Sequence, residues 1–202
     1  MAMVLAAAAV HTHLVRVGLR SYASVNVRSA ECMDTHYFAV LIGVGATTVN
    51  AYLAEASIAD RHARGLFGDK TLSQCVENFR NAICEGLLKI MSKMGIAVIS
   101  SYRGGYNFEA VGLSRAIVND LFPGMPNKIS GEGYNSLAYS AELRHNAAYD
   151  SAVARLPVGG FYKQRDGGET HAYSANLMHL LQSAVQNDSY STYLQFAAGV
   201  KA

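Results

Sequence analysis

The strongest constraint in this sequence is a long amphipathic segment over residues 71–94. Apolar side chains recur in it at intervals of three and four residues, at Leu72, Val76, Phe79, Ile83, Leu87, Ile90 and Met94. This spacing places them on one face of a helix. Thr71 and Gln74 form the T-x-x-Q pattern of a capping box, and Gly95 follows the last apolar position. We therefore expect one long helix whose apolar face packs against the rest of the chain.

The segment that follows this helix predicts the fold class. Residues 96–100 (IAVIS) are an apolar run, and a glycine-containing loop (SYRGGYNFEA, 101–110) comes next. The run is typical of a short, fully buried strand. A helix, a glycine, an apolar strand and a loop in this order indicate an α/β protein with parallel strands.

Other elements follow from caps, periodicity and turn residues. Asp34 is a predicted N-cap before a buried apolar run at 38–44, and Thr47 or Thr48 is a predicted cap for the next helix, which closes at Gly65. Ser114, Ser174 and Ser189 are further predicted caps. Further helices are expected at 3–17, 114–121, 134–155 and 175–187, a strand at 22–27, and a hairpin of strands 158–162 and 169–173 around residues 166–168.

Residues 122–133 (FPGMPNKISGEG) are the best candidate for a domain edge. They contain two of the three prolines of the chain and three of its glycines. Such residues favour turns and linkers over regular elements. The sequence therefore predicts two regions, residues 1–121 and 122–202.

Composition excludes several classes of protein. The chain is 50% apolar and 16% charged, which is typical of a globular chain with a substantial core. Its net charge of +2 gives little long-range attraction for nucleic acid or for an acidic membrane surface. The apolar run at residues 1–10 lacks a preceding basic residue and is too short to span a bilayer. We expect a cytoplasmic protein with no nucleic-acid and no membrane partner.

The cysteines and histidines do not form a recognisable site. Cys32, Cys75 and Cys84 are an odd number at wide spacings without a CxxC pair, which favours reduced thiols over a zinc ribbon or a disulfide framework. Cys75 and Cys84 fall in the apolar helical pattern, where buried thiols are common. The histidine pairs His11 with His13 and His171 with His179 lack the spacing of a metal motif.

Two glycine patterns and one arginine remain as candidates. Residues 43–45 (GVG) begin like a dinucleotide fingerprint, but Thr48 occupies the third glycine position and the preceding run is helix-like, so we reject that interpretation. Residues 131–133 (GEG) favour an ordinary tight turn over an anion-binding loop. Arg103, followed by Gly104 and Gly105, is a candidate contact for a phosphate or a neighbouring domain, although its spacing favours a solvated loop arginine.

Four segments resemble the large subunit of glutamate synthase, in the order found in that family and over essentially the whole chain. They are HTHLVRVGLR (11–20), DTHYFAVLIGVGATTVNAYLAE (34–55), GLLKIMSKMGIAVISSYRGGYNFEAVGL (86–113) and GGETHAYSANLMHLLQSAV (167–185). The sequence is more similar to the bacterial NADPH-dependent enzyme of this family than to the ferredoxin-dependent one. Ala51 stands where many members have proline, and residues 104–106 (GGY) replace Gly-Ala-Gln.

The resemblance implies a piece of a larger enzyme. That enzyme has a glutaminase domain, a central domain, an FMN-binding (β/α)8 barrel and a β-helix. Residues 1–121 would be the end of the central domain, a partial, (β/α) barrel-like α/β fold with mostly parallel strands. Residues 122–202 would be the junction and the start of the FMN-binding domain, with a helix and hairpin region that leads into a truncated TIM-type barrel.

The implied activity is the formation of L-glutamate from L-glutamine and 2-oxoglutarate with reducing equivalents from NADPH. FMN and an iron–sulfur cluster serve the full-length enzyme, and its partners are the remaining large-subunit domains and a flavoprotein small subunit. Cys32, Cys75 and Cys84 match neither the glutaminase nucleophile nor the cluster ligands of that family, so no catalytic, cofactor-binding or metal residue is transferred to this chain. We expect a structural, tunnel-forming segment that is inactive alone and binds no cofactor. The alternative is a stand-alone scaffold of a split glutamate synthase.

Overall fold

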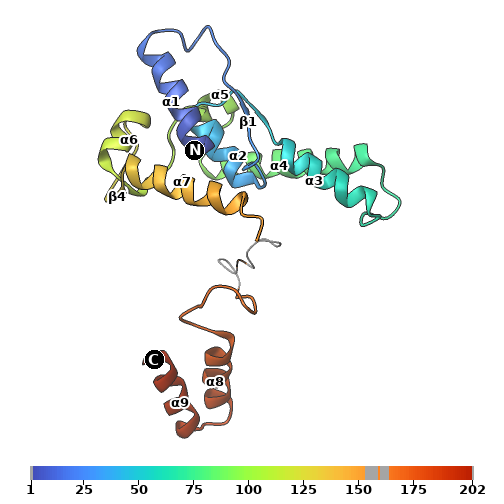
Figure 1. Ribbon diagram of the computed structural model, residues 1–202, viewed down its shortest axis with the longest axis vertical. Coiled ribbons are helices and arrows are strands. Elements are labelled where there is room, and N and C mark those ends of the chain that lie inside the picture. The colour runs from blue at the N-terminus through green and yellow to red at the C-terminus, as the bar shows by residue number, and fades with distance from the viewer. Residues whose placement is uncertain (1, 153–158, 160–163, 202) are drawn as a thin grey trace. The chain divides into compact units, whose positions relative to one another are not determined.

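The computed structural model describes residues 2–152, 159 and 164–201, and these form two compact units, Met1–His145 and Asn146–Ala202 (Figure 1). The first unit begins with α1 (Met3–Arg16), β1 (Asn26–Arg28), α2 (Thr35–Gly43), β2 (Thr48–Asn50), α3 (Tyr52–Ala63) and α4 (Leu72–Lys93). It continues with α5 (Ile99–Tyr102), β3 (Val111–Leu113), α6 (Arg115–Leu121) and β4 (Ile129–Glu132). Helix α7 (Tyr134–Ala148) crosses the unit boundary, and α8 (Ala175–Gln186) and α9 (Tyr190–Lys201) follow.

Helix α4 confirms the prediction from the amphipathic segment. The Thr71 hydroxyl accepts a hydrogen bond from the Gln74 backbone amide at 3.3 Å, and the Gln74 side chain accepts one from the Thr71 amide at 2.9 Å. Ile83 is buried on the apolar face and Leu87 is half-buried, whereas Leu72 in the first turn is 40% exposed. This face packs against α2 and α3, so the helix is held by tertiary contacts as well as by its cap.

The main core joins elements that are far apart in the sequence. Ala8 of α1, Leu41 of α2 and Ile117 and Val118 of α6 are almost completely buried in one apolar cluster. A smaller cluster contains Ala39, Met91 and Tyr102. Helices α2 and α4 both contribute residues to the two clusters, so this pair connects the main core to the smaller one.

The strands pair in parallel, as expected, but only in two short sheets. β1 pairs with β2, with Asn26 opposite Thr48, and β3 pairs with β4, with Val111 opposite Ile129. Each sheet has two strands, and the part of the chain that the structure describes contains no barrel. The unit is therefore a mostly helical mixed α/β structure, and the prediction of a barrel-like sheet is not met within these residues.

Two predictions around α3 and α4 are wrong. Residues 96–100 are not a buried strand: the chain reverses after Gly95, the Ile96 amide bonds to Met91 O at 2.9 Å, and α5 begins at Ile99, which is 39% exposed. Thr47 and Thr48 do not cap a helix, because Thr48 begins β2 and α3 begins at Tyr52. The predicted strand at 22–27 is present only as the short β1.

The proline- and glycine-containing segment 122–133 lies inside the first unit. The Ala110 amide donates to Pro126 O and the Ser114 amide to Glu132 O, both at 2.9 Å. Residues 131–132 belong to β4 rather than to a tight turn, because Gly131 lies against the backbone of Gly112, where a Cβ would overlap its carbonyl. The compact units divide instead after His145, and the assignment of 1–121 and 122–202 to two family domains stays a prediction.

The second unit is a helical hairpin of α8 and α9. The Ser174 and Ser189 hydroxyls accept hydrogen bonds from the Leu177 and Thr192 amides, which confirms both predicted caps. Gly199 lets the two helices approach closely, because a Cβ there would overlap the Leu177 side chain. Residues 169–173 form no strand, and the other predicted strand, 158–162, falls largely outside the described residues.

Candidate functional site

Three of the four resemblance segments meet in the first unit. The end of α1 and the loop after it (11–20), the loop after α2 (43–47) and the loop after α5 (103–108) are joined by hydrogen bonds and ring contacts. We call this cluster of His11, Thr12, Arg20, Gly45, Thr47, Gly104 and Tyr106 the loop junction. It is the best-defined polar arrangement that the sequence segments build together.

Arg20 is the centre of the loop junction. Its Nε donates to Nδ1 of His11 at 2.9 Å, and its Nη2 donates to Gly45 O at 2.8 Å and to the Thr47 hydroxyl at 3.1 Å. Its Nη1 donates to Ala23 O. All three guanidinium nitrogens are therefore bonded within the protein, which is the arrangement of an arginine that fixes loops.

His11 packs on two glycines that lie far apart in the sequence, Gly45 and Gly104. A Cβ on Gly45 would overlap the His11 ring, and a Cβ on Gly104 would lie 3.0 Å from its Nε2. Both glycines have positive φ, +115° and +68°. The glycines of the 43–45 pattern therefore serve loop packing. Burial, and next the positive charge of Arg20, lower the pKa of His11 below its usual value, which favours the neutral ring that accepts a hydrogen bond from Arg20.

Tyr106 ties the third loop to the other two. Its backbone amide donates to Gly43 O at 3.1 Å, and Gly104 N donates to Ile42 O at 3.0 Å. Its hydroxyl lies 3.0 Å from the Thr12 hydroxyl, which itself donates to Leu121 O at 2.8 Å. The loop after α5 is thus fixed to α1, to α2 and to the end of α6.

Arg103 differs from its predicted environment. It lies in the loop that follows α5, as predicted, but it is half-buried rather than exposed. Its Nε is buried and lacks a hydrogen-bond partner within the described part of the chain. A contact of Arg103 with a phosphate or a neighbouring domain stays a prediction.

The thiols and histidines are dispersed. Cys32 and Cys75 are buried, but Cys84 is exposed, so the prediction of a buried thiol is wrong for Cys84. Burial is the main cause that raises the pKa of Cys32. Among residues 2–152, 159 and 164–201, no three His, Cys, Asp or Glu side chains are grouped to hold a metal ion. In those same ranges no helix combines the length and apolarity that a membrane crossing requires.

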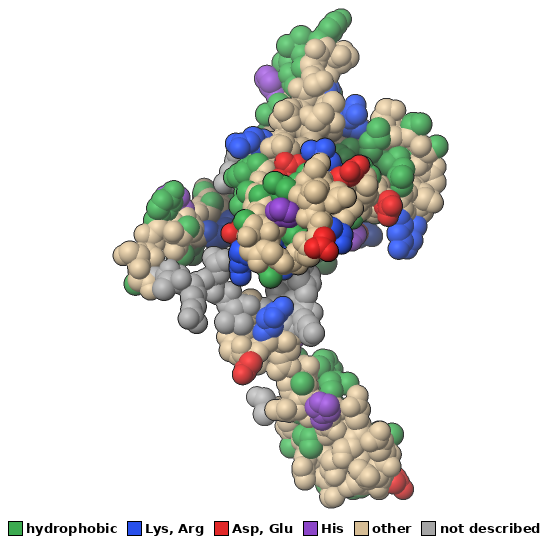
Figure 2. All heavy atoms as spheres, turned by 90° about the vertical axis from the view of Figure 1, so that its right-hand side faces the viewer, with side chains coloured by type: hydrophobic (Ala, Val, Ile, Leu, Met, Phe, Trp, Pro, Cys, Tyr) green, Lys and Arg blue, Asp and Glu red, His purple; other side chains and the backbone are tan. Residues whose placement is uncertain are grey.

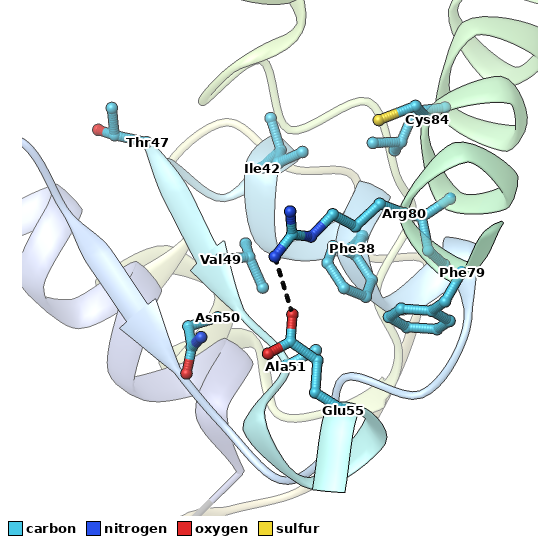
Figure 3. A pocket seen from close by; sticks show the side chains of 12 residues that line it. Phe38, Ile42, Thr47, Val49, Asn50, Ala51, Glu55, Phe79, Arg80 and Cys84 are labelled. Atoms are coloured by element: carbon cyan, nitrogen blue, oxygen red, sulfur yellow. Dashed lines mark ion pairs between the residues drawn. The ribbon is translucent and has the colours of Figure 1, made fainter. Parts of the chain in front are cut away.

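A pocket that sequence reasoning missed lies among α2, β2, α3 and α4 (Figure 3). It has a volume of about 420 Å³ and an apolar lining that includes Phe38, Phe79 and Ile83. Arg80 of α4 reaches Glu55 of α3 at 3.7 Å across it. The periodicity of α4 marked Phe79 and Ile83 as core residues, but nothing in the spacing of Glu55 and Arg80 predicted their contact.

Charged side chains of both signs occur on the face shown in Figure 2. On the face shown in Figure 2, basic and acidic side chains are interspersed on the first unit. This distribution agrees with the small net charge of +2. The view gives no sign of the basic stripe that a nucleic-acid-binding face would require.

Comparison with known proteins gives a consistent result. The family model described as "Glutamate synthase central domain" matches residues 1–114. The NADPH glutamate synthase large chain of Azospirillum brasilense is 57% identical over 98% of this chain and 13% of its own length. That of Bacillus subtilis is 38% identical over 95% of this chain and 13% of its own length. The ferredoxin-dependent glutamate synthase of Spinacia oleracea is 38% identical over 95% of this chain and 12% of its own length. This chain thus spans about an eighth of the length of these relatives.

Proposed function

Because the chain belongs to the glutamate synthase central-domain family, we propose that it is a structural segment of a glutamate synthase large chain of the bacterial NADPH-dependent type. The whole enzyme would form L-glutamate from L-glutamine and 2-oxoglutarate. FMN, when bound in the barrel domain, would supply the hydride for the reductive step, with electrons from NADPH through iron–sulfur clusters. No step is assigned to a residue of this chain.

The loop junction is the observation that carries the structural role. Three segments shared with the family converge there, and the Arg20 guanidinium makes four hydrogen bonds, to His11, to Thr47 and to two backbone carbonyls. A residue that binds substrate keeps donors or acceptors directed at that substrate, whereas most of the Arg20 donors are used within the junction. The junction therefore suits a rigid element that positions neighbouring domains and walls the passage of ammonia between their active sites.

A segment exchange tests this proposal. Replacing the corresponding part of the Azospirillum brasilense large chain with residues 1–202 should give a chimera that retains glutamine-dependent glutamate synthesis, because 57% identity preserves the packing. The same chimera with Arg20→Met should lose domain assembly and glutamine-dependent activity together, since the three loops separate. The chain alone should show no flavin absorbance and form no glutamate.

The outcomes separate the two interpretations left open by the sequence. A chimera that folds and binds FMN but makes no glutamate from glutamine would contradict the proposal. Restoration of activity when the chain is supplied as a separate polypeptide to the other domains would instead support a scaffold of a split enzyme. Under the proposal, the partners are the other large-chain domains and the flavoprotein small subunit, and the site of action is the cytoplasm.

A further inference from the structure

The pocket among α2, β2, α3 and α4 has the chemistry of a small-molecule site. We propose that it binds a free α-amino acid with an apolar side chain, in its zwitterionic form. The pocket shares Thr47 with the loop junction, but the proposal uses neither Thr47 nor the structural role given above. It depends on an apolar lining and on one pair of opposite charges at the mouth (Figure 3).

The lining fits an apolar side chain of moderate size. Phe38 and Phe79 meet edge to face with ring centroids 6.4 Å apart, and Ile83 is 8% exposed beside them. The volume of about 420 Å³ falls in the range of pockets that hold small organic ligands. A side chain such as that of phenylalanine would therefore exchange water for aromatic and aliphatic contacts.

The charged pair gives the mouth two opposite binding groups. Arg80 and Glu55 come from different helices, and their side chains are 68% and 36% exposed. Figure 3 shows the Arg80 guanidinium extending over the lining toward the Glu55 carboxylate. Their separation of 3.7 Å is long for a charge-assisted hydrogen bond, and an exposed pair of this kind contributes little to stability. A ligand with two charges can therefore break this pair and bind both side chains with little loss of stability.

These two groups favour a zwitterion over other ligands. A simple carboxylate would pair with Arg80 but would face the negative Glu55, and a simple amine would pair with Glu55 but would face Arg80. An α-amino acid presents its carboxylate to Arg80 and its ammonium group to Glu55 while its side chain enters the apolar lining. The interior of a peptide has neither backbone charge, so a free amino acid fits the mouth better than a docked protein segment.

Cys84 provides a direct readout. It is exposed and lines the pocket, whereas Cys32 and Cys75 are buried, so a maleimide should react first at Cys84. We expect L-phenylalanine to slow this alkylation with a half-effect at about millimolar concentration, as is usual for a ligand of about a dozen heavy atoms. Phenylpropionate, phenethylamine and glycine each lack one of the three features and should protect at least about tenfold more weakly.

Variants with a matched control complete the test. Arg80→Gln and Glu55→Gln should each weaken protection by about tenfold or more, because each removes one half of the charged mouth. Arg64→Gln removes another exposed pair, Arg64 with Asp60 at 3.5 Å, outside the pocket, and should leave protection unchanged. Saturation-transfer NMR on the 202-residue chain reads the same binding without the thiol, and far-UV circular dichroism checks that each variant folds.

The proposal has clear failing outcomes. Absence of both protection and saturation transfer at about fifty times the expected half-effect concentration would overturn it. Equal protection by phenylalanine and glycine would refute the role of the apolar lining. Equal protection by phenylalanine and phenylpropionate, or an unchanged effect in Glu55→Gln, would refute recognition of a zwitterion. None of these outcomes bears on the segment exchange, so the two proposals fail separately.

Discussion

Replacing Gly45 with alanine tests whether the loop junction is held by the close contact between this glycine and His11. Gly45 has φ of +115°, a conformation that a residue with a Cβ rarely adopts. The added Cβ would overlap Cγ and Nδ1 of the His11 ring, and Nδ1 is the atom that accepts the hydrogen bond from Arg20. The substitution should therefore strain the backbone and displace the ring at the same time.

The two effects give the magnitude. A non-glycine residue held in this region costs about 1–3 kcal/mol. Forcing extra volume into a packed site costs about another 1–3 kcal/mol. Gly45→Ala should thus lower the free energy of unfolding of the first unit by about 2–6 kcal/mol. Gly65→Ala is the matched control, because Gly65 has φ of +72° with nothing within 4 Å of its Cβ position, and should cost only about 1 kcal/mol.

Urea denaturation followed by circular dichroism measures these differences. The double variant His11→Ala with Gly45→Ala separates the terms, because it removes the overlap but keeps the backbone strain. We expect it to be more stable than the sum of the single changes by about 1–3 kcal/mol. If Gly45→Ala costs no more than Gly65→Ala, or if the double variant is simply additive, the proposed contact does not hold the junction.

Two further predictions concern the core and pH. Ile83→Ala should lower the free energy of unfolding of the first unit by about 2–5 kcal/mol, because Ile83 is only 8% exposed. Leu88→Ala on the same helix should change it by less than about 0.5 kcal/mol, because Leu88 is 64% exposed. Urea denaturation measures both changes. The lowered pKa of His11 means that the unfolded state binds more protons than the folded state. The stability that neutral His11 contributes should be complete above the pKa that His11 has in the unfolded chain. It should be lost as pH falls through the lower pKa of His11 in the folded protein. His11→Asn should flatten this dependence as pH falls below the usual histidine pKa of about 6.5, and an unchanged slope would contradict it.

Features that depend on local hydrogen bonding followed from the sequence. The caps at Asp34, Thr71, Ser114 and Ser174 are all present, each with its side-chain oxygen accepting from a backbone amide three residues later. A cap needs only neighbours in the chain, so its pattern carries most of the information. The same reasoning failed for Thr47, whose hydroxyl is used by Val25 N and Arg20 instead.

Predictions failed where burial depends on distant partners. The apolar run at 96–100 predicts a buried strand, yet Val98 within it is 53% exposed. A strand forms only where another strand lies alongside it, and the local sequence does not show whether one does. The segment 122–133 reads as a linker, yet β4 within it pairs with β3. Turn-forming residues permit a linker but do not decide whether the chain returns to pair with an earlier strand.

The candidate site shows the same division. Residues 11–20, 34–55 and 86–113 were each visible as distinctive segments, but their spacing gave no reason to place Arg20 against His11, Gly45 and Thr47. The pocket likewise needs Glu55 and Arg80 on separate helices to meet. Neither arrangement has a periodic signature, because the contacts run between elements.

By itself, the sequence determined the caps at Asp34, Thr71, Ser114 and Ser174, the mixed α/β character and the membership in the glutamate synthase central-domain family, because caps, periodicity and shared segments are properties of neighbouring residues. The tertiary structure alone decided that Gly45 and Gly104 seat His11, that Cys84 is exposed, and that an ion pair spans an apolar pocket. These features depend on which surfaces meet when α1, α2 and α4 pack, and such contacts run between elements rather than within any one segment.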